Sequence, residues 1–215
     1  MSKPEITVID YGVGNLLSVQ RGLEHCGAEV ILTSDPEVVA AARRVVLPGV
    51  GAFANAMQAL QERNLVPAIQ ELAKRRTPLL GICLGMQLLL EESEEFGLTR
   101  GLGLIPGRVV PIPTQTVSGE AQKIPHIGWS SLVRAEGCAD WHSTVLEDNV
   151  HGEATYFVHS FMSVPTDPMH RVADCLYGGH RIAAVIAIDQ ITACQFHPEK
   201  SGEVGLKILR RFVGS

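Results

Sequence analysis

Short apolar segments alternate with segments of helical spacing through the first part of the chain, and this alternation is the strongest constraint on the fold. The expected strands cover residues 6–10, 29–33, 45–47 and 77–82. The expected helices cover residues 16–26, 36–42, 53–63, 67–75 and 84–90. Strands joined through helices lie parallel to one another, and the helices cover both faces of the sheet. The pattern therefore predicts an α/β fold with a mostly parallel central sheet flanked by helices.

The second half of the chain differs in composition from the first. Proline and glycine are frequent there, and the apolar runs are short and rich in residues that favour strands. Strands are expected at residues 108–112, 123–129, 155–159, 171–177, 181–188 and 191–195, and a closing helix at 203–213. The last two strands are separated only by Asp189 and Gln190, which favours a hairpin. We expect these strands to join the same sheet as antiparallel members, which makes the sheet mixed and residues 1–215 a single domain.

Composition excludes several function classes. Apolar residues make up 46% of the chain and charged residues 19%, a balance that supports a substantial core. The net charge of −5 disfavours a nucleic-acid surface, which needs a basic field. The apolar run at 79–90 is far shorter than the ~20 residues of a membrane helix. The first residues lack the apolar core of a signal peptide, so a cytoplasmic location is expected.

No cofactor or metal is expected either. The five cysteines include no Cys-x-x-Cys pair, so neither a disulfide framework nor a zinc ribbon is indicated. The histidines lack zincin spacing. Gly12 and Gly14 follow a strand, but Leu17 occupies the third position of the dinucleotide-binding fingerprint.

The sequence Gly-Ile-Cys-Leu-Gly at residues 81–85 joins an apolar strand to an apolar helix. This is the pattern of a nucleophile elbow, in which a sharp turn pushes the central side chain out at the carboxyl edge of the sheet. The helix that follows favours a thiolate and offers backbone N–H groups to an oxyanion. Cys83 is therefore a candidate nucleophile. The alternative is a buried cysteine in a tight turn.

A second motif, Gln-Phe-His-Pro-Glu-Lys-Ser at residues 195–201, ends an expected strand. Residues two apart in an extended chain face the same side, so Glu199 can lie beside His197 and orient its imidazole. The other ring nitrogen can then take the proton of Cys83. A His-Pro-Glu segment alone is more often a surface turn. The third motif is Pro-Gly-Val-Gly at 48–51, whose backbone N–H groups can face an oxyanion or simply form a flexible loop.

Together, the segments 81–87 and 195–201 resemble the class I (triad) glutamine amidotransferases. Within that class, the chain resembles the glutaminase subunits of imidazole glycerol phosphate synthases at residues 10–16, 48–53, 101–107, 123–129 and 156–160. All members of the class share the triad. The Tyr-Gly-x-Gly-Asn opening and the Pro-His-x-Gly-Trp segment are specific to the subtype. The matches extend from residue 6 to residue 201, almost the whole chain.

The resemblance implies a flavodoxin-like sheet and a Cys83, His197 and Glu199 triad that hydrolyses glutamine. It further implies that the oxyanion and the substrate are held by Gly49, Val50, Gly51, Leu84, Gln87, Glu95, His159, Ser160 and Phe161. Family members often have tyrosine where this chain has Phe161, so a hydroxyl contact is not expected there. Apart from Glu95, the acidic run at residues 91–95 is most simply interpreted as the solvated end of a helix.

The resemblance also implies a partner, a (β/α)₈ cyclase subunit that forms a heterodimer with the glutaminase and uses its ammonia in histidine biosynthesis. Trp129, Tyr156 and His126 are the residues expected at this interface. Three other functions stay open: a glutaminase subunit of anthranilate or aminodeoxychorismate synthesis, a cysteine hydrolase acting alone, and a docking subunit without activity. The presence of Cys83, His197 and Glu199 argues against a docking subunit without activity.

Overall fold

The computed structural model describes residues 3–214, and within them the central sheet has eight strands in the order β2-β1-β3-β4-β14-β13-β12-β9. Five neighbouring strands are parallel: β2 (Glu29–Thr33), β1 (Glu5–Ile9), β3 (Val45–Gly49), β4 (Leu79–Cys83) and β14 (Ile191–Cys194). The antiparallel ones are β13 (His180–Ile188), β12 (Arg171–Tyr177) and β9 (Val133–Arg134). The parallel part has the order of flavodoxin-like sheets, which confirms the α/β prediction.

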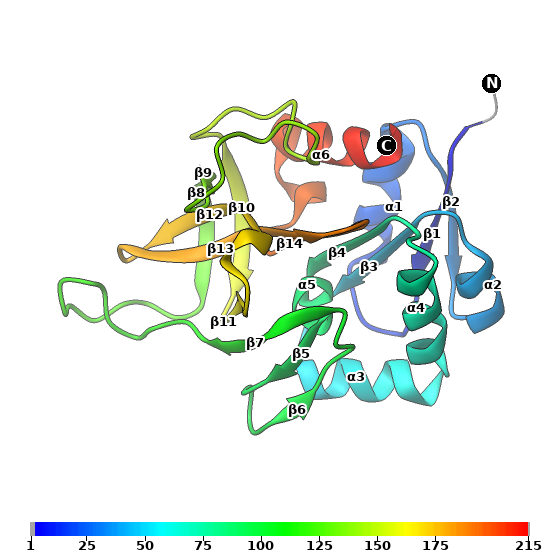
Figure 1. Ribbon diagram of the computed structural model, residues 1–215, viewed down its shortest axis with the longest axis horizontal. Coiled ribbons are helices and arrows are strands. Elements are labelled where there is room, and N and C mark those ends of the chain that lie inside the picture. Colours follow the sequence, from blue (N-terminus) through cyan, green and yellow to red (C-terminus); the bar gives the residue numbers. More distant parts are fainter. Residues whose placement is uncertain (1–2, 215) are drawn as a thin grey trace.

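Helices cover both faces of this sheet (Figure 1). On one face, α1 (Leu16–His25) and α6 (Gly202–Gly214) contribute Leu23 and Leu209 to the same core cluster as Ile6. On the other face, α2 (Pro36–Ala41), α3 (Phe53–Glu62) and α4 (Leu65–Lys74) pack with Val45. Proline at the first position of α2 follows Asp35, whose side chain accepts a hydrogen bond from the Glu37 N–H, an arrangement typical of a helix start.

The expected helix at 84–90 is too long. In the structure α5 (Leu84–Leu88) ends early, and β5 (Leu90–Ser93) follows almost directly. The backbone of β5 pairs in parallel with β7 (Ile105–Pro111) and antiparallel with β6 (Thr99–Arg100). The acidic run at 91–95 is therefore not a helix end, because its first part lies in a sheet.

The second-half strands do not all join the central sheet, so that expectation is wrong for several of them. A separate sheet has the order β11-β7-β5-β6, in which β11 is Phe161–Pro165. The strands β8 (His126–Ser131) and β10 (Ala154–His159) form a two-stranded ribbon. Their burial alternates along the chain, because only one face of the ribbon packs on the core. The 181–195 hairpin prediction is confirmed by the antiparallel pairing of β13 with β14.

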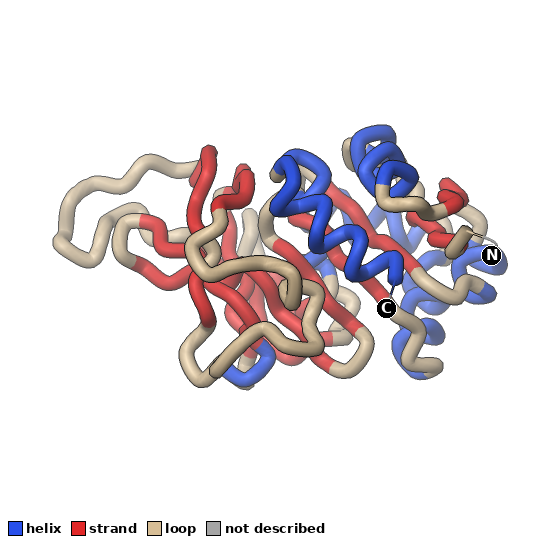
Figure 2. Tube along the Cα trace, turned by 90° about the horizontal axis from the view of Figure 1, so that it is seen from above, coloured by secondary structure: helices blue, strands red, loops and turns tan. Residues whose placement is uncertain are grey.

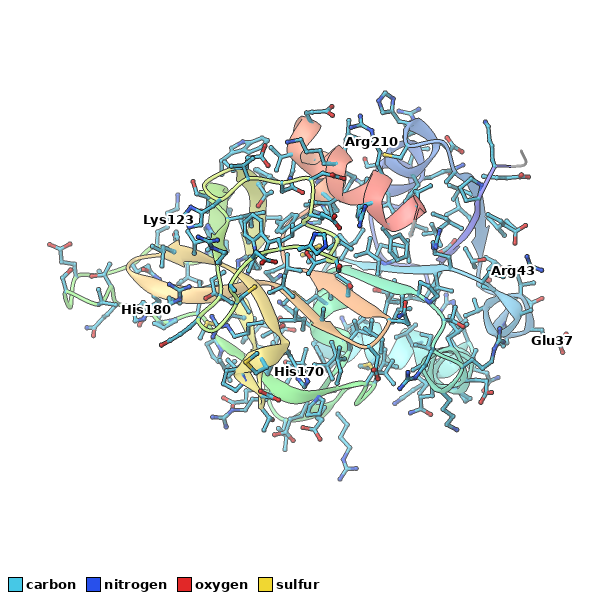
Figure 3. All side chains as sticks on the ribbon, turned by 45° about the horizontal axis from the view of Figure 1, so that its top comes forward. Glu37, Arg43, Lys123, His170, His180 and Arg210 are labelled. Carbon is cyan, nitrogen blue, oxygen red and sulfur yellow. The ribbon has the colours of Figure 1, made fainter. Side chains whose placement is uncertain are left out.

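Strands and helices are unevenly distributed along the molecule. Figure 2 shows the helices gathered toward one end, whereas the other end consists mainly of strands and loops. The remaining elements are two short 3₁₀ helices, η1 (Pro168–His170) and η2 (Pro198–Lys200). Figure 3 shows labelled ionisable side chains such as Glu37, Arg43 and Lys123 at the periphery. Among the described residues, no helix is long and apolar enough to cross a membrane.

Candidate active site

Cys83 lies at a strained turn between β4 and α5. Its backbone φ is +55° and its ψ is −111°, a conformation that a residue with a side chain adopts only under constraint. A Cβ added at Gly85 would lie 1.8 Å from the Leu47 carbonyl oxygen, and one at Gly81 would lie 2.8 Å from Leu89 Cδ1. Both glycines are therefore needed so that the chain can fold this tightly around Cys83.

His197 and Glu199 lie just beyond the end of β14, the strand beside β4. The Nδ1 atom of His197 is 2.8 Å from Glu199 Oε1, and the two side chains are only 3% and 1% exposed. Burial alone lowers the pKa of His197, but its interactions with the nearby Cys83 and Glu199 raise that pKa to about 9. The imidazolium form is therefore stabilised at neutral pH.

Two polar atoms of this pair are left without partners. Among the described residues, neither His197 Nε2 nor Glu199 Oε2 has a hydrogen-bond partner, although both atoms are buried. Buried polar atoms normally find partners, and exceptions are frequent at catalytic sites. The unpartnered Nε2 is the nitrogen that proton transfer to or from Cys83 would use.

A cavity of about 400 Å³ opens beside the triad. It is lined by Val50, Gly51, Cys83, Leu84, Gln87, Glu95, Pro125, Val158, His159, Ser160, Phe161 and His197. The structure thus brings together almost all residues for which the sequence predicts a role in holding glutamine or its oxyanion. Glu199 lies behind His197, away from the lining. Gly49 is also outside the lining: it pairs with Cys83 in the sheet, and a Cβ there would lie 2.4 Å from the Tyr11 hydroxyl oxygen.

The loop after β3 borders this cavity and is held at both ends. At its start, the Tyr11 hydroxyl donates a hydrogen bond of 2.8 Å to the Pro48 carbonyl. At its end, the N–H of Phe53, the first residue of α3, donates to Glu95 Oε2 at 2.6 Å. Between these anchors, Val50 is 41% exposed and Gly51 has a φ of +95°. Glu95 therefore lies beside the loop as well as at the cavity wall.

The residues expected at a partner interface separate into two groups. Trp129 and Tyr156 are opposite one another on β8 and β10, with ring centroids 6.0 Å apart, and Trp129 is 58% exposed. The His126 side chain differs from the expectation, because it is only 1% exposed. Its ring stacks on Tyr177 at 4.0 Å, and its Nδ1 lies 3.0 Å from His159 Nε2. His126 thus belongs to the interior beneath the ribbon rather than to the surface.

Burial controls the charge of this histidine pair. It lowers the pKa of both His126 and His159 to about 4, so both rings are neutral at pH 7. His159 Nδ1 lies 2.8 Å from the Phe161 carbonyl, an atom that can only accept, so Nδ1 carries the proton. His126 Nδ1 then donates to His159 Nε2. The pair supports the backbone at Phe161, on the cavity wall.

Three residues near the site were not predicted to act there. Gln195 lies within 3.9 Å of Cys83 Sγ, Val158 offers its carbonyl to the same sulfur at 3.9 Å, and Tyr11 anchors the loop after β3. Gln195 could have been found from its position, since it ends the expected strand at 191–195 and lies two residues before His197. Val158 and Tyr11 act through contacts between distant segments that no local pattern reveals.

The described residues contain no cluster of three or more histidine, cysteine, aspartate or glutamate side chains that could hold a metal ion. All five cysteines are free. Cys194 is fully buried on the strand beside β4, and burial raises the pKa of its thiol, which keeps it protonated. Cys194 is therefore not expected to act as a nucleophile, although it pairs with Ile82, the neighbour of Cys83.

Comparison with known proteins places this site in a family. The family model described as glutamine amidotransferase class-I matches residues 7–214. The imidazole glycerol phosphate synthase subunit HisH 1 of Legionella pneumophila (strain Lens) is 50% identical over 208 residues, which cover 97% of this chain and 98% of that protein. The HisH subunit of Geobacillus sp. (strain WCH70) is 46% identical over 208 residues, 97% of this chain and 95% of that protein.

Solved structures share the fold at lower identity. A structure titled PurLQS from Thermotoga maritima has a TM-score of 0.72 and 21% identity, and the match covers 99% of this chain and 98% of that one. A structure titled glutamine amidotransferase has a TM-score of 0.71 and 14% identity, covering 97% of this chain and 99% of that one. The chain belongs to the class I glutamine amidotransferases and, within them, to the family of HisH subunits of imidazole glycerol phosphate synthase.

Proposed function

We propose that this chain is the glutaminase subunit of an imidazole glycerol phosphate synthase. It hydrolyses glutamine to glutamate and ammonia and passes the ammonia to a cyclase subunit in histidine biosynthesis. The observation that carries the proposal is the convergence of Cys83 and the His197–Glu199 pair on one cavity of about 400 Å³. That volume lies within the usual range for small-molecule sites. Family membership supports glutamine as the substrate.

In the first half-reaction, the Cys83 thiolate attacks the side-chain carbonyl carbon of glutamine. Backbone N–H groups at Val50 and Leu84 hold the resulting oxyanion, and both residues line the cavity. His197 Nε2, which has no partner among the described residues, gives its proton to the departing amine. The carbon–nitrogen bond breaks, ammonia leaves, and a glutamyl thioester remains on Cys83.

In the second half-reaction, His197 takes a proton from water, and the resulting hydroxide attacks the thioester. Glutamate leaves and Cys83 is restored. Glu199 holds Nδ1 of His197 throughout and stabilises the imidazolium, which gives its proton in the first half-reaction and forms again in the second. Gln87, Glu95, His159, Ser160 and Phe161 surround the space into which the amino acid would fit.

The acceptor of the ammonia is a separate chain. We infer a (β/α)₈ cyclase partner in a cytoplasmic heterodimer with lyase activity, because the relatives are named as subunits of a synthase. The exposed Trp129 and the neighbouring Tyr156 supply an aromatic surface of the kind that protein interfaces favour. We further infer that residues 1–215 act as one glutaminase domain.

The test is glutamine hydrolysis with and without the cyclase of the same organism and its ribonucleotide ligand. We expect slow turnover by the chain alone and a rise of about 10²-fold with the liganded cyclase, the size expected when one oxyanion donor is gained. Glutamine hydrolysis that no cyclase stimulates would indicate a hydrolase acting alone or a subunit of another synthase. No hydrolysis in any combination would contradict the glutaminase role.

A further inference from the structure

Gln195 is a buried amide beside the candidate nucleophile. It follows β14 directly, and the pairing of Cys194 with Ile82 in the sheet places Gln195 next to Cys83. Its side chain is 0% exposed, and that of Gln87 is 5% exposed. Buried amides are costly unless both their donors and acceptors are satisfied, so their partners define their orientation.

The hydrogen bonds around Gln195 form a directed chain. The Phe161 carbonyl can only accept, and it receives hydrogen bonds from Gln87 Nε2 at 3.0 Å and from His159 Nδ1 at 2.8 Å. Gln87 Nε2 also donates to Gln195 Oε1 at 3.0 Å. The other end of the Gln195 amide, Nε2, therefore faces Cys83 Sγ at 3.9 Å.

Turning over the side-chain amide of Gln195, alone or together with that of Gln87, would break this series of hydrogen bonds. If Gln195 alone turned over, its Nε2 would face Nε2 of Gln87, two donors without an acceptor. If both amides turned over, Oε1 of Gln87 would face the Phe161 carbonyl, two acceptors without a donor. The backbone carbonyl of Phe161 thus determines that a donor points at the sulfur and that Gln87 keeps its own Oε1 for the cavity it lines.

We propose that Gln195 is a positioning residue with two separable effects, and this inference rests on the proposed glutaminase function. Through Nε2, Gln195 donates a hydrogen bond to Cys83 Sγ and stabilises the thiolate, because donors bind an anionic acceptor more strongly than a neutral one. Through Oε1, Gln195 holds the Gln87 amide so that Gln87 Oε1 can accept a hydrogen bond from the bound glutamine.

The thiolate effect is tested by alkylation of Cys83 with iodoacetamide as a function of pH, followed by mass spectrometry of the peptide that contains Cys83. Methionine has a similar length to glutamine but lacks both polar atoms. We expect Gln195→Met to move the midpoint of alkylation upward by about one pH unit, a roughly tenfold loss of thiolate at a fixed pH. Gln87→Met should move that midpoint less than Gln195→Met does, because the amide of Gln195 still lies beside the sulfur but its orientation is no longer fixed by Gln87.

The positioning effect is tested by steady-state glutaminase kinetics of the complex with the cyclase. We expect both methionine variants to raise KM for glutamine by roughly tenfold, and the double variant to raise it little further, because the two residues act through one hydrogen bond. Gln195→Glu keeps an acceptor for Gln87 and removes the amide donor to the sulfur. We therefore expect this variant to restore KM but not the alkylation midpoint.

The matched control is Gln190→Met, which changes an exposed glutamine at the opposite end of the same strand. It should leave KM, kcat and the alkylation midpoint unchanged. The inference is overturned if Gln195→Met keeps both the wild-type KM and the wild-type alkylation midpoint, whether or not its melting temperature is lowered. Failure of the wild-type complex to hydrolyse glutamine would instead contradict the proposed function, since alkylation requires no turnover.

Discussion

The turns that follow β3 and β4 lie side by side at the same edge of the sheet, yet they are built in opposite ways. At the turn after β4, Cys83 is 6% exposed, and Gly85 packs so closely that a Cβ would lie 1.8 Å from a carbonyl oxygen. At the turn after β3, Val50 is 41% exposed, and a Cβ on Gly51 would meet nothing within 4 Å. The first turn is locked by packing and the second is open.

This difference matches the two tasks of the proposed reaction. A nucleophile needs one geometry, since small displacements from the attacking position are costly in rate. An oxyanion loop that responds to a partner needs two geometries of similar energy. The glycine after Val50 allows the second, because glycine adopts positive φ at no steric cost. The rigid turn and the open turn thus lie at the ends of two paired strands, β4 and β3.

The largest expected effect on the rate comes from removing the nucleophile at the locked turn. We expect Cys83→Ala to lower glutamine-dependent synthesis by at least ~10⁴-fold in the complex, because no other group can form the thioester. Synthesis from added ammonium salts should continue, since the cyclase holds the synthetic site. Both rates are measured by product formation in the cyclase complex. Loss of the ammonium-dependent rate in a well-folded complex would mean that Cys83 acts beyond ammonia release.

The next largest effect concerns the proton carrier that faces the locked turn. We expect His197→Ala to lower kcat by ~10³-fold or more and Glu199→Gln to lower it less, because an amide still holds the imidazole but does not stabilise its charge. The pH dependence of kcat/KM also tests the direction of the effect. The His197 pKa is raised to about 9, partly by Glu199, so the proton donor is present below that pH and lost above it.

Glu199→Gln should therefore move the alkaline limb of kcat/KM to lower pH, by about one unit. The measurement is kcat/KM for glutamine between pH 6 and pH 10 with the cyclase present. An unchanged alkaline limb in the variant would show that the limb reports another group. Equal losses of kcat in the two variants would contradict the orienting role given to Glu199.

The contrast between the turns can be measured directly as stability with two alanine substitutions. We expect Gly85→Ala to lower the free energy of unfolding by about 3 kcal/mol, because its Cβ would meet the Leu47 carbonyl in a packed interior. Gly51→Ala has space, and its φ of +95° should cost only about 1 kcal/mol. Urea unfolding monitored by tryptophan fluorescence provides both values. Similar losses at the two sites would remove the distinction between a locked and an open turn.

The locked turn was predictable from the sequence for the same reason that it is rigid. Its geometry is local, so glycines two before and two after Cys83 already indicate it. The pairing of His197 with Glu199 is local as well, although Glu199 reaches the imidazole from the 3₁₀ helix η2 and not, as the sequence suggested, from an extended chain. Gln195 lies two residues before His197, so the local sequence contains a signal for this residue as well.

Long-range contacts explain what the sequence did not reveal. The run 84–90 is buried throughout, and only Gly85 and Gln87 interrupt its apolar residues, so it has no period that distinguishes the end of α5 from the start of β5. His126 is buried because the ring of Tyr177, from β12, stacks on it, and no pattern near residue 126 contains that information. The same holds for Tyr11, which contacts Pro48 across 37 residues.

The smallest expected effect comes from a substitution that loosens the open turn after β3. A substitution at Gly49 would not serve, because a Cβ there would lie 2.4 Å from the Tyr11 hydroxyl oxygen. Tyr11→Phe instead removes only the hydrogen bond to the Pro48 carbonyl, worth about 1 kcal/mol, and leaves the ring in the core. The peptide between Pro48 and Gly49, which precedes the one leading into Val50, is then less restrained, and the loop turns more readily. We expect glutamine hydrolysis by the chain without cyclase to rise about threefold to fivefold, while the rate of the liganded complex stays within twofold.

The ratio of these two rates is the informative quantity, because a general loss of stability would lower both. Tyr177→Phe is the matched control: its hydroxyl also donates to a backbone carbonyl, that of Lys123, but away from the loop after β3. This control should leave the ratio unchanged. A wild-type ratio in Tyr11→Phe would show that the Tyr11 hydroxyl does not restrain the loop, and that the freedom of the open turn begins only at Val50.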